Sequence, residues 1–375
     1  MPECENPLWP CAVTGAAACL AGFDGMTVVI HGSSGCYYYP ATLLRVPLHG
    51  TFITENEVIF GSEQRLREVL DDIRGKSKKI AVILTCVPAI LGEDIRSLLK
   101  DYDMILVDSP GFSGEIEDGY KKALSVLAPL VDPTREGVNI DGACLFDPFS
   151  GGNVREIIRL LGCASVPVGT VFCSDRLEDA GHAAAYTVGT NTDFSSEVGS
   201  CLGGTLGFEE TSTTFRNVAS VYPEADISPV EKEIELEDER VVRACDKFLR
   251  RFDPPQALIF GGFSYATFAA ETLKHYLDAE ILYVGSRNKP GISPYPCGQV
   301  QGLSRVKSLI RQFNPDLVIG SSFERSVDGS RAFVGLIPPL RGITRLAPQT
   351  VAGITGTLSF VENVLNACMD RKNNR

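Results

Sequence analysis

Residues 27–36 read TVVIHGSSGC, a short apolar run followed by a glycine-rich turn. β-branched residues favour a strand, and two glycines so close together are unfavourable unless the turn needs their freedom. The same order of strand, turn and helix follows downstream, which predicts a parallel sheet with its turns gathered at one edge. The expected strands are 27–31, 79–86 and 104–108, with helices over 63–74 and 92–99.

Two further sets of this kind follow. The second has strands over 139–146 and 166–172 around a helix over 152–161. The third has strands over 256–261, 280–284, 316–320 and 333–336, with helices over 265–277 and 301–312. We therefore predict an α/β protein of three Rossmann-like domains with parallel sheets, over residues 1–130, 131–252 and 253–375. The charged stretch 223–252 predicts a surface helix that ends the second domain.

Composition excludes several classes of function. The 375 residues are 44% hydrophobic, enough for a large core, and carry a net charge of −12. Such an acidic chain is a poor match for a nucleic-acid backbone. There is no apolar run of about 18 residues to span a membrane. The first residues, MPECEN, do not resemble a secretory signal, so we expect a cytoplasmic protein.

Common nucleotide and hydrolase motifs are missing. The sequence contains no G-x-x-x-x-G-K-[ST], no G-x-G-x-x-G and no G-x-S-x-G. We therefore expect no ATP binding by a phosphate loop in this chain, no dinucleotide fingerprint and no serine hydrolase site.

Three of the twelve cysteines lie in similar glycine-rich or turn-like surroundings: Cys11, Cys36 and Cys86. Cys36 follows the first expected strand and Cys86 ends the second, so both should lie at the carboxyl edge of one sheet, where ligands bind. No two cysteines are spaced C-x-x-C, so any metal site must combine distant cysteines. The alternative is that these thiols are only buried packing residues.

The motifs around these cysteines resemble the catalytic-component subunits of the nitrogenase family. They are PCAVTGA from residue 10, HGSSGC from residue 31, ITENEVIFGSEQRL from residue 53 and TCVPAILGEDI from residue 85. The family includes the molybdenum–iron protein subunits, their cofactor-assembly scaffolds, the protochlorophyllide and chlorophyllide reductases and the methanogen Ni-sirohydrochlorin a,c-diamide reductive cyclase. The resemblance is specific over residues 8–114, weaker beyond, and implies three α/β domains.

The resemblance implies that Cys11, Cys36 and Cys86 are ligands of an interface iron–sulfur cluster. Three thiolates are one short of those that a 4Fe-4S cluster takes, so a second subunit must share the cluster. We expect a homodimer, although a heterodimer with a related chain would satisfy the same chemistry. Cys4 is a further candidate ligand, whereas Cys19 falls in an alanine-rich helix and is expected to pack.

Within the family, the sequence resembles the compact reductive cyclase. In our alignment Asn191 stands where nitrogenase has its cofactor cysteine, and no histidine follows His275. We expect the missing ligands to leave an open cavity between the domains for a nickel tetrapyrrole.

Arg331, Arg341 and Arg345 are candidates for binding the carboxylates of that substrate, because guanidinium groups pair with carboxylates; each is equally well read as a surface arginine. Electrons would come from a separate iron protein-like reductase, which alone binds ATP. No catalytic residue is assigned, although Glu55, Glu57 and Glu93 lie near the cluster motifs.

The alternatives are another tetrapyrrole reductase subunit or a non-catalytic cofactor-assembly scaffold.

Overall fold

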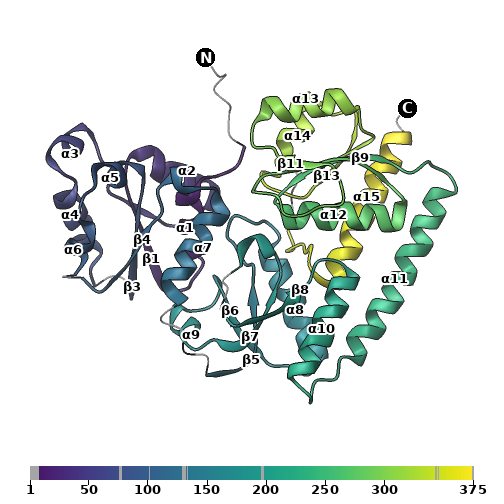
Figure 1. The fold of residues 1–375 in the computed structure, drawn as a ribbon, viewed down its shortest axis with the longest axis horizontal. Coiled ribbons are helices and arrows are strands. Elements are labelled where there is room, and N and C mark those ends of the chain that lie inside the picture. The colour runs from purple at the N-terminus through teal and green to yellow at the C-terminus, as the bar shows by residue number, and fades with distance from the viewer. Residues whose placement is uncertain are drawn as a thin grey trace.

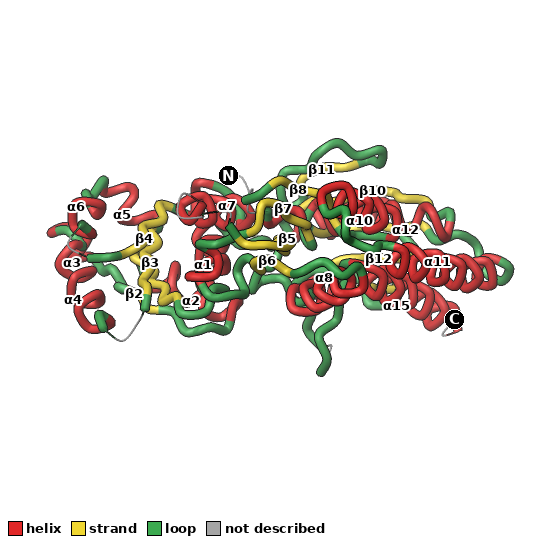
Figure 2. Tube along the Cα trace, turned by 90° about the horizontal axis from the view of Figure 1, so that it is seen from below, coloured by secondary structure: helices red, strands yellow, loops and turns green. Residues whose placement is uncertain are grey.

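The structure is a computed structural model that describes residues 8–75, 78–100, 102–128, 132, 134–195, 198–342, 344 and 346–373. Three parallel sheets run through the described residues and follow one another along the long axis of the molecule (Figures 1 and 2). One sheet falls in each of the three expected residue ranges. None of the described helices combines the length and apolarity needed to cross a bilayer.

The first sheet has the strand order β2-β1-β3-β4. These strands are β1 (Met26–His31), β2 (His49–Gly50), β3 (Lys79–Leu84) and β4 (Met104–Asp108), all paired in parallel.

Alternate residues of the central strand β1 serve opposite faces of this sheet. Val28 and Ile30 pack with helices α1 (Ala12–Leu20) and α7 (Ile116–Leu127). Val29 packs with α4 (Glu63–Ile73) and α6 (Ile95–Leu99) on the other side. Cover on both faces explains why the strands read as continuous apolar runs.

Short helices at the carboxyl edge of this sheet differ from the expected elements. Cys86 does not end β3 but begins α5 (Cys86–Leu91), because β3 stops at Leu84. Gly92 ends α5 with a positive φ of 69°, a conformation that suits glycine, so the expected helix over 92–99 is only α6. Cys36 lies inside α2 (Ser34–Leu44) rather than in the turn before it, and α3 (Glu55–Phe60) follows.

The second sheet has the order β6-β5-β7-β8. Its strands are β5 (Arg135–Asp141), β6 (Val168–Val171), β7 (Ala184–Gly189) and β8 (Ser200–Gly204), with helices α8 (Ser150–Cys163), α9 (Leu177–Ala180), α10 (Phe208–Val221) and α11 (Ser228–Leu249). Strand β5 begins and ends earlier in the sequence than the strand that we expected over 139–146. Strands β7 and β8 were not anticipated, because they are rich in glycine and polar residues.

The third sheet has the order β11-β10-β9-β12-β13. Its strands are β9 (Gln256–Gly261), β10 (Glu280–Ser286), β11 (Cys297–Gln299), β12 (Leu317–Gly320) and β13 (Ala332–Gly335), with helices α12 (Phe263–Leu277), α13 (Leu303–Phe313), α14 (Ser322–Val327) and α15 (Gly353–Asn373).

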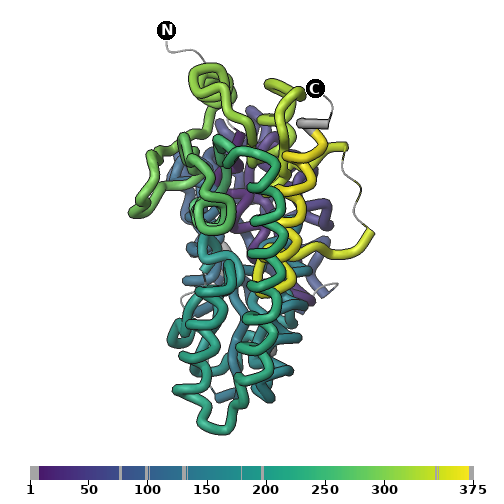
Figure 3. The backbone as a smooth tube through the Cα atoms, turned by 90° about the vertical axis from the view of Figure 1, so that its right-hand side faces the viewer, coloured from purple at the N-terminus to yellow at the C-terminus, as the bar shows by residue number. Residues whose placement is uncertain are grey.

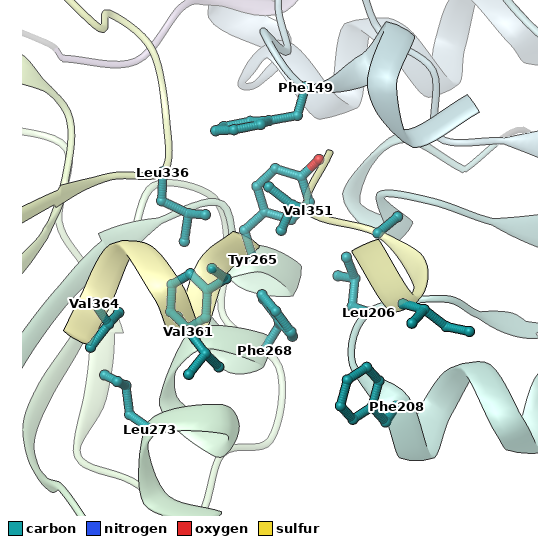
Figure 4. Close-up of a cluster of buried hydrophobic side chains, with 14 of the residues drawn as sticks. Phe149, Leu206, Phe208, Tyr265, Phe268, Leu273, Leu336, Val351, Val361 and Val364 are labelled. Carbon is teal, nitrogen blue, oxygen red and sulfur yellow. The ribbon is translucent and has the colours of Figure 1, made fainter. Parts of the chain in front are cut away.

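Helix α15 joins the second and third domains. It runs beside α11 (Figure 3) and also contacts α8 and α10. Helix α15 packs into a single apolar cluster that includes Phe208 from the second domain, Phe268 from the third and Val361 from α15 itself (Figure 4). This shared core fixes how the two domains meet.

Candidate functional site

Cys11 and Cys86 lie against the same glycine. Cys11 is the residue before α1, and Cys86 is the first residue of α5. A β-carbon placed on Gly111, in the 3₁₀ helix η1 (Gly111–Ser113), would stand 3.1 Å from the sulfur of Cys11 and 3.2 Å from that of Cys86. The Gly111 amide also donates a hydrogen bond to Cys86 Sγ over 3.1 Å. Only glycine leaves this space beside both sulfurs.

Cys36 belongs to the neighbouring loop of the same sheet edge. It is the third residue of α2, and Ser33 donates a weak hydrogen bond to its sulfur over 3.7 Å. The loop before it packs tightly on the residue before Cys86, since a β-carbon on Gly32 would come within 1.9 Å of Thr85 Oγ1. The loops that carry Cys36 and Cys86 are therefore held together.

The three thiols offer the type of ligand that an iron–sulfur cluster takes. All are half-buried, so each is sheltered but still reachable from the sheet edge. Within the described part of the chain, no three His, Cys, Asp or Glu side chains converge on a point where one metal ion would bind. A cluster does not need such convergence, because its thiolates bind different iron atoms, and thiolate is the ligand that it takes. The space kept free by Gly111 is consistent with that fit.

Exposed apolar side chains surround this edge. We call them the apolar rim; they are Tyr38 and Tyr39 on α2, Ile59 and Phe60 on α3, Ile90 and Leu91 on α5, and Phe112 in η1. Phe60 is 85% exposed, Ile90 73% and Phe112 65%. Apolar side chains gathered on one surface usually mark a protein interface.

Arg331 and Arg341, two of the candidates for binding substrate carboxylates, belong to the third domain and not to this edge. Arg331 precedes β13 and is engaged within its own domain, by an ion pair with Asp328 of 2.8 Å and hydrogen bonds to Asn314 Oδ1 and the Pro315 carbonyl. Arg341 is exposed, with its guanidinium over the ring of Phe323.

Arg345 and Cys4 lie outside the described residues. Cys19 is buried in α1, in the core of the first domain, with its sulfur 3.5 Å from that of Cys173.

At the junction of the three domains, the described residues do not form the open cavity that we expected. Where the three domains meet, residues that include Trp9, Asn191 and Ile337 enclose only about 20 Å³. That is room for a single water molecule, not a macrocycle. Asn191, at the position matched to the nitrogenase cofactor cysteine, lies in this wall.

Hydrogen bonds close this junction. The Asp193 carboxylate accepts from the amide and hydroxyl of Ser264 at the start of α12, over 3.1 and 2.9 Å. Ser264 Oγ also lies 2.7 Å from Asn191 Oδ1. Tyr265 donates to Asp147 over 2.6 Å. These bonds link the second domain to the third where a cofactor would otherwise need space.

The first domain contributes a buried acid to the same junction. Glu117 on α7 accepts hydrogen bonds from the Trp9 indole over 3.0 and 3.1 Å. Burial, and then the negative charge of Asp193, raise the pKa of Glu117 to about 8. Burial also raises the pKa values of Asp147 and Asp193. Sequence reasoning missed these acids, because their neighbours come from three separate domains.

A second buried network was also missed. The ring of His31, at the end of β1, faces Thr51 Oγ1 over 3.1 Å and Ser62 Oγ over 2.9 Å. Ser62 in turn donates to the carboxylate of Glu93. The histidine in the HGSSGC motif was the available signal, since its residue type is rare in this chain.

Comparisons with known proteins agree with the motifs. The model of the family described as "Nitrogenase component 1 type Oxidoreductase" matches residues 11–369. The nitrogenase molybdenum-iron protein beta chain of Bradyrhizobium diazoefficiens is 30% identical over 186 residues, which cover 42% of this chain and 36% of that protein. The cofactor biosynthesis protein NifN of Rhodobacter capsulatus is 32% identical over 178 residues, covering 42% of this chain and 39% of NifN.

These matches span little more than a third of the length of the two relatives. A solved structure of nitrogenase Cp1 at pH 6.5 superimposes with a TM-score of 0.84 at 16% identity, covering 99% of this chain and 94% of that chain. The expected three-domain α/β fold is therefore confirmed.

Proposed function

This chain belongs to the nitrogenase component 1 type oxidoreductase family, and from that premise we propose that it is the cluster-bearing component of an ATP-dependent reductase. Cys11, Cys36 and Cys86 would hold a 4Fe-4S cluster, which supplies low-potential one-electron transfer. The observation that carries this proposal is the approach of the Cys11 and Cys86 sulfurs to the space kept free by Gly111.

A second copy of the chain would complete the cluster. One copy offers three candidate thiolates, and Phe112 stands exposed beside Gly111 at the same edge. Symmetric pairing through this part of the apolar rim would bury Phe112 and Tyr39 and bring two sets of thiolates together. A pair of identical chains needs no further gene product, which favours the homodimer over a pair of related chains.

Electrons would come from an iron protein-like reductase that binds ATP. This chain has no phosphate loop of its own. The part of the apolar rim on α3 and α5, including Phe60 and Ile90, offers that partner a contact surface next to the cysteine loops. ATP hydrolysis should therefore require the second protein, and ATPase activity in the purified chain alone would contradict the division of labour.

For the substrate, we propose a nickel tetrapyrrole, Ni-sirohydrochlorin a,c-diamide, which would be reduced and cyclised. Asn191 in place of a cofactor-binding cysteine argues against a large metal cofactor at the junction. The enclosed volume requires that the domains separate there, or that the macrocycle binds outside the junction. Arg341 has an exposed guanidinium for substrate carboxylates, Arg331 would first have to leave Asp328, and Arg345 remains a prediction.

A cofactor-assembly scaffold is the second candidate. The closed junction and the similarity to NifN favour it. Incubating the cluster-loaded protein with the reductase, ATP and the nickel tetrapyrrole separates the two functions. The reductase proposal predicts loss of the substrate absorption spectrum, whereas a scaffold leaves the tetrapyrrole intact and releases a cluster to an acceptor protein.

The cluster assignment is tested by serine substitution under anaerobic conditions. Three single variants are compared: Cys11→Ser, Cys36→Ser and Cys86→Ser. Each should bind less iron and show weaker visible absorption from thiolate-bound iron. The exposed Cys201 and half-buried Cys163 supply matched controls whose serine variants should keep the iron. A triple variant that binds as much iron as the unmodified protein would show that these cysteines are not the ligands.

A further inference from the structure

A hydrogen-bonded chain leads from the surface of the first domain to the buried side chain of His31. Glu93 is partly exposed, while Ser62 and His31 are fully buried. The Glu93 carboxylate accepts from the Ser62 amide over 2.5 Å and from its hydroxyl, and Ser62 Oγ lies 2.9 Å from His31 Nε2. His31 Nδ1 lies 3.1 Å from Thr51 Oγ1. Every polar atom of the imidazole therefore has a partner that belongs to the first domain.

This chain is tied to both loops that carry the candidate ligands. His31 ends β1, and the segment that follows it leads directly to Cys36. The hydroxyl of Thr85, the residue before Cys86, donates to the His31 carbonyl over 2.9 Å. Glu93 follows the helix that Cys86 begins. The backbone of His31 is thus joined to the two segments that carry Cys36 and Cys86.

The partners of His31 satisfy the ring in both of its protonation states. Thr51 Oγ1 has the Gly32 carbonyl as another acceptor at 3.4 Å, and Ser62 Oγ has the Glu93 carboxylate. With both hydroxyl hydrogens turned to those acceptors, the oxygens accept from a ring protonated on both nitrogens. When the ring is neutral, one hydroxyl turns its hydrogen toward the unprotonated nitrogen. Only hydroxyl rotation is needed, and no heavy atom has to move.

The charge on His31 depends on negative charge nearby. Burial lowers the pKa of His31 to about 4, against the opposing effect of Glu93, so the ring is neutral at neutral pH. The charged and titratable groups around it are Glu93, Arg65 on α4, which donates to the Thr51 carbonyl over 3.0 Å, and the exposed His49 on β2. An added electron at thiolates carried by the two segments that follow His31 and Thr85 is the change that would favour the protonated ring.

We propose that His31 takes up one proton when an electron reaches the cluster held by the neighbouring cysteines, with Glu93 and Ser62 as the proton path from solvent. The inference rests on the proposed function. One electron comes from the reduced iron–sulfur reductase and one proton from water. Glu93 is protonated at the surface and passes a proton to Ser62 Oγ, Ser62 passes its own to His31 Nε2, and Glu93 returns to the carboxylate. His31 thereby offsets the added negative charge inside the protein.

Redox titration of the cluster-loaded dimer at several pH values between about 6 and about 8 tests this. The midpoint potential should fall as pH rises, with a slope of one proton per electron. His31→Gln keeps a polar side chain but cannot titrate, so the slope should be lost. His49→Gln is the matched control, a histidine of the same sheet that is exposed, and should keep the slope. Iron content is measured first, so that each variant is compared at equal loading.

Glu93→Gln supplies a second variant that leaves the imidazole in place. Without the carboxylate, protonation of His31 loses its stabilising charge, so the pH-dependent range should move to lower pH. A potential that does not change with pH in the unmodified protein, or a slope that survives in His31→Gln, overturns the relay while the cluster assignment stands. If the unmodified protein binds no iron, the proposed function and the relay both fail. If the His31→Gln variant does not bind iron, the Glu93→Gln variant decides. A pH-dependent range of the midpoint potential that is the same in Glu93→Gln as in the unmodified protein overturns the relay.

Discussion

The amide of Gly111 donates a hydrogen bond to the sulfur of Cys86 over 3.1 Å. The two residues follow different strands of the first sheet and meet at its carboxyl edge. η1 follows β4, and α5 follows β3, so the parallel pairing of these strands places the loops side by side. The same glycine leaves the space beside Cys11. One backbone position therefore organises two of the three candidate ligands.

Replacing Gly111 with alanine should lower iron binding without unfolding the chain. The new β-carbon would stand 3.1 and 3.2 Å from the two sulfurs, closer than most real contacts of this kind, so the thiols must move slightly. Iron content after anaerobic reconstitution measures the effect, and circular dichroism checks the fold. Gly162→Ala is the control, because nothing lies within 4 Å of its added carbon. Equal iron content in both variants would contradict the assignment.

Glu117→Gln should change how stability depends on pH. The folded-state pKa of Glu117, about 8, lies above the ordinary value of 4.5, so between these values the folded chain holds a proton that the unfolded chain has released. The free energy of unfolding should therefore fall as pH rises through this range, by up to about 1.4 kcal/mol per pH unit from this residue. Urea unfolding at several pH values measures it. In the glutamine variant this part of the slope should vanish; an unchanged slope would rule out Glu117 as its source.

The buried ion pair of the third domain should be needed for stability. Arg287 contacts Glu324 where both side chains are almost completely buried. Glu324→Ala leaves a buried guanidinium without its partner, which costs about 3–5 kcal/mol. Lys274→Ala breaks the exposed pair with Asp278 and should cost about 1 kcal/mol or less. Chemical denaturation compares the two variants, and similar small losses would mean that Arg287 finds other partners.

Phe112→Ser should weaken self-association of the cluster-loaded protein. Phe112 is 65% exposed in the single chain and stands beside the cysteines, so pairing across this edge would bury its ring. Anaerobic sedimentation should give a dimer dissociation constant at least about tenfold larger than that of the unmodified protein. Losing one buried aromatic contact costs more than about 1.4 kcal/mol of association free energy. Ile292, fully exposed in the third domain, provides the control substitution Ile292→Ser. Dimers of equal strength in both variants would show that pairing uses another surface.

Much of the fold could be predicted because its signals are local. The apolar runs around Val29, Val82 and Ile259 have the length and β-branched content of buried strands, and glycine-rich turns separate them from helices. Strands β7 and β8 escaped prediction because glycine and polar residues dominate them, and tertiary pairing overrides such weak propensities. The cysteine motifs of the first domain could be recognised for the same local reason, because each is a short run of consecutive residues.

The sequence by itself determined the family, the parallel α/β units and the three candidate ligands, since each depends on residues that are neighbours in the chain. Only the tertiary structure decided what those residues meet. Gly111 approaches Cys11 across about a hundred residues of chain, and Glu117, Asp193 and Ser264 come from three different domains. Contacts of this kind depend on how rigid sheets pack against one another, which no periodicity in the sequence records. That packing filled the junction where an open cavity was expected, because the hydrogen bonds of Asp193, Asn191 and Tyr265 draw the domains together.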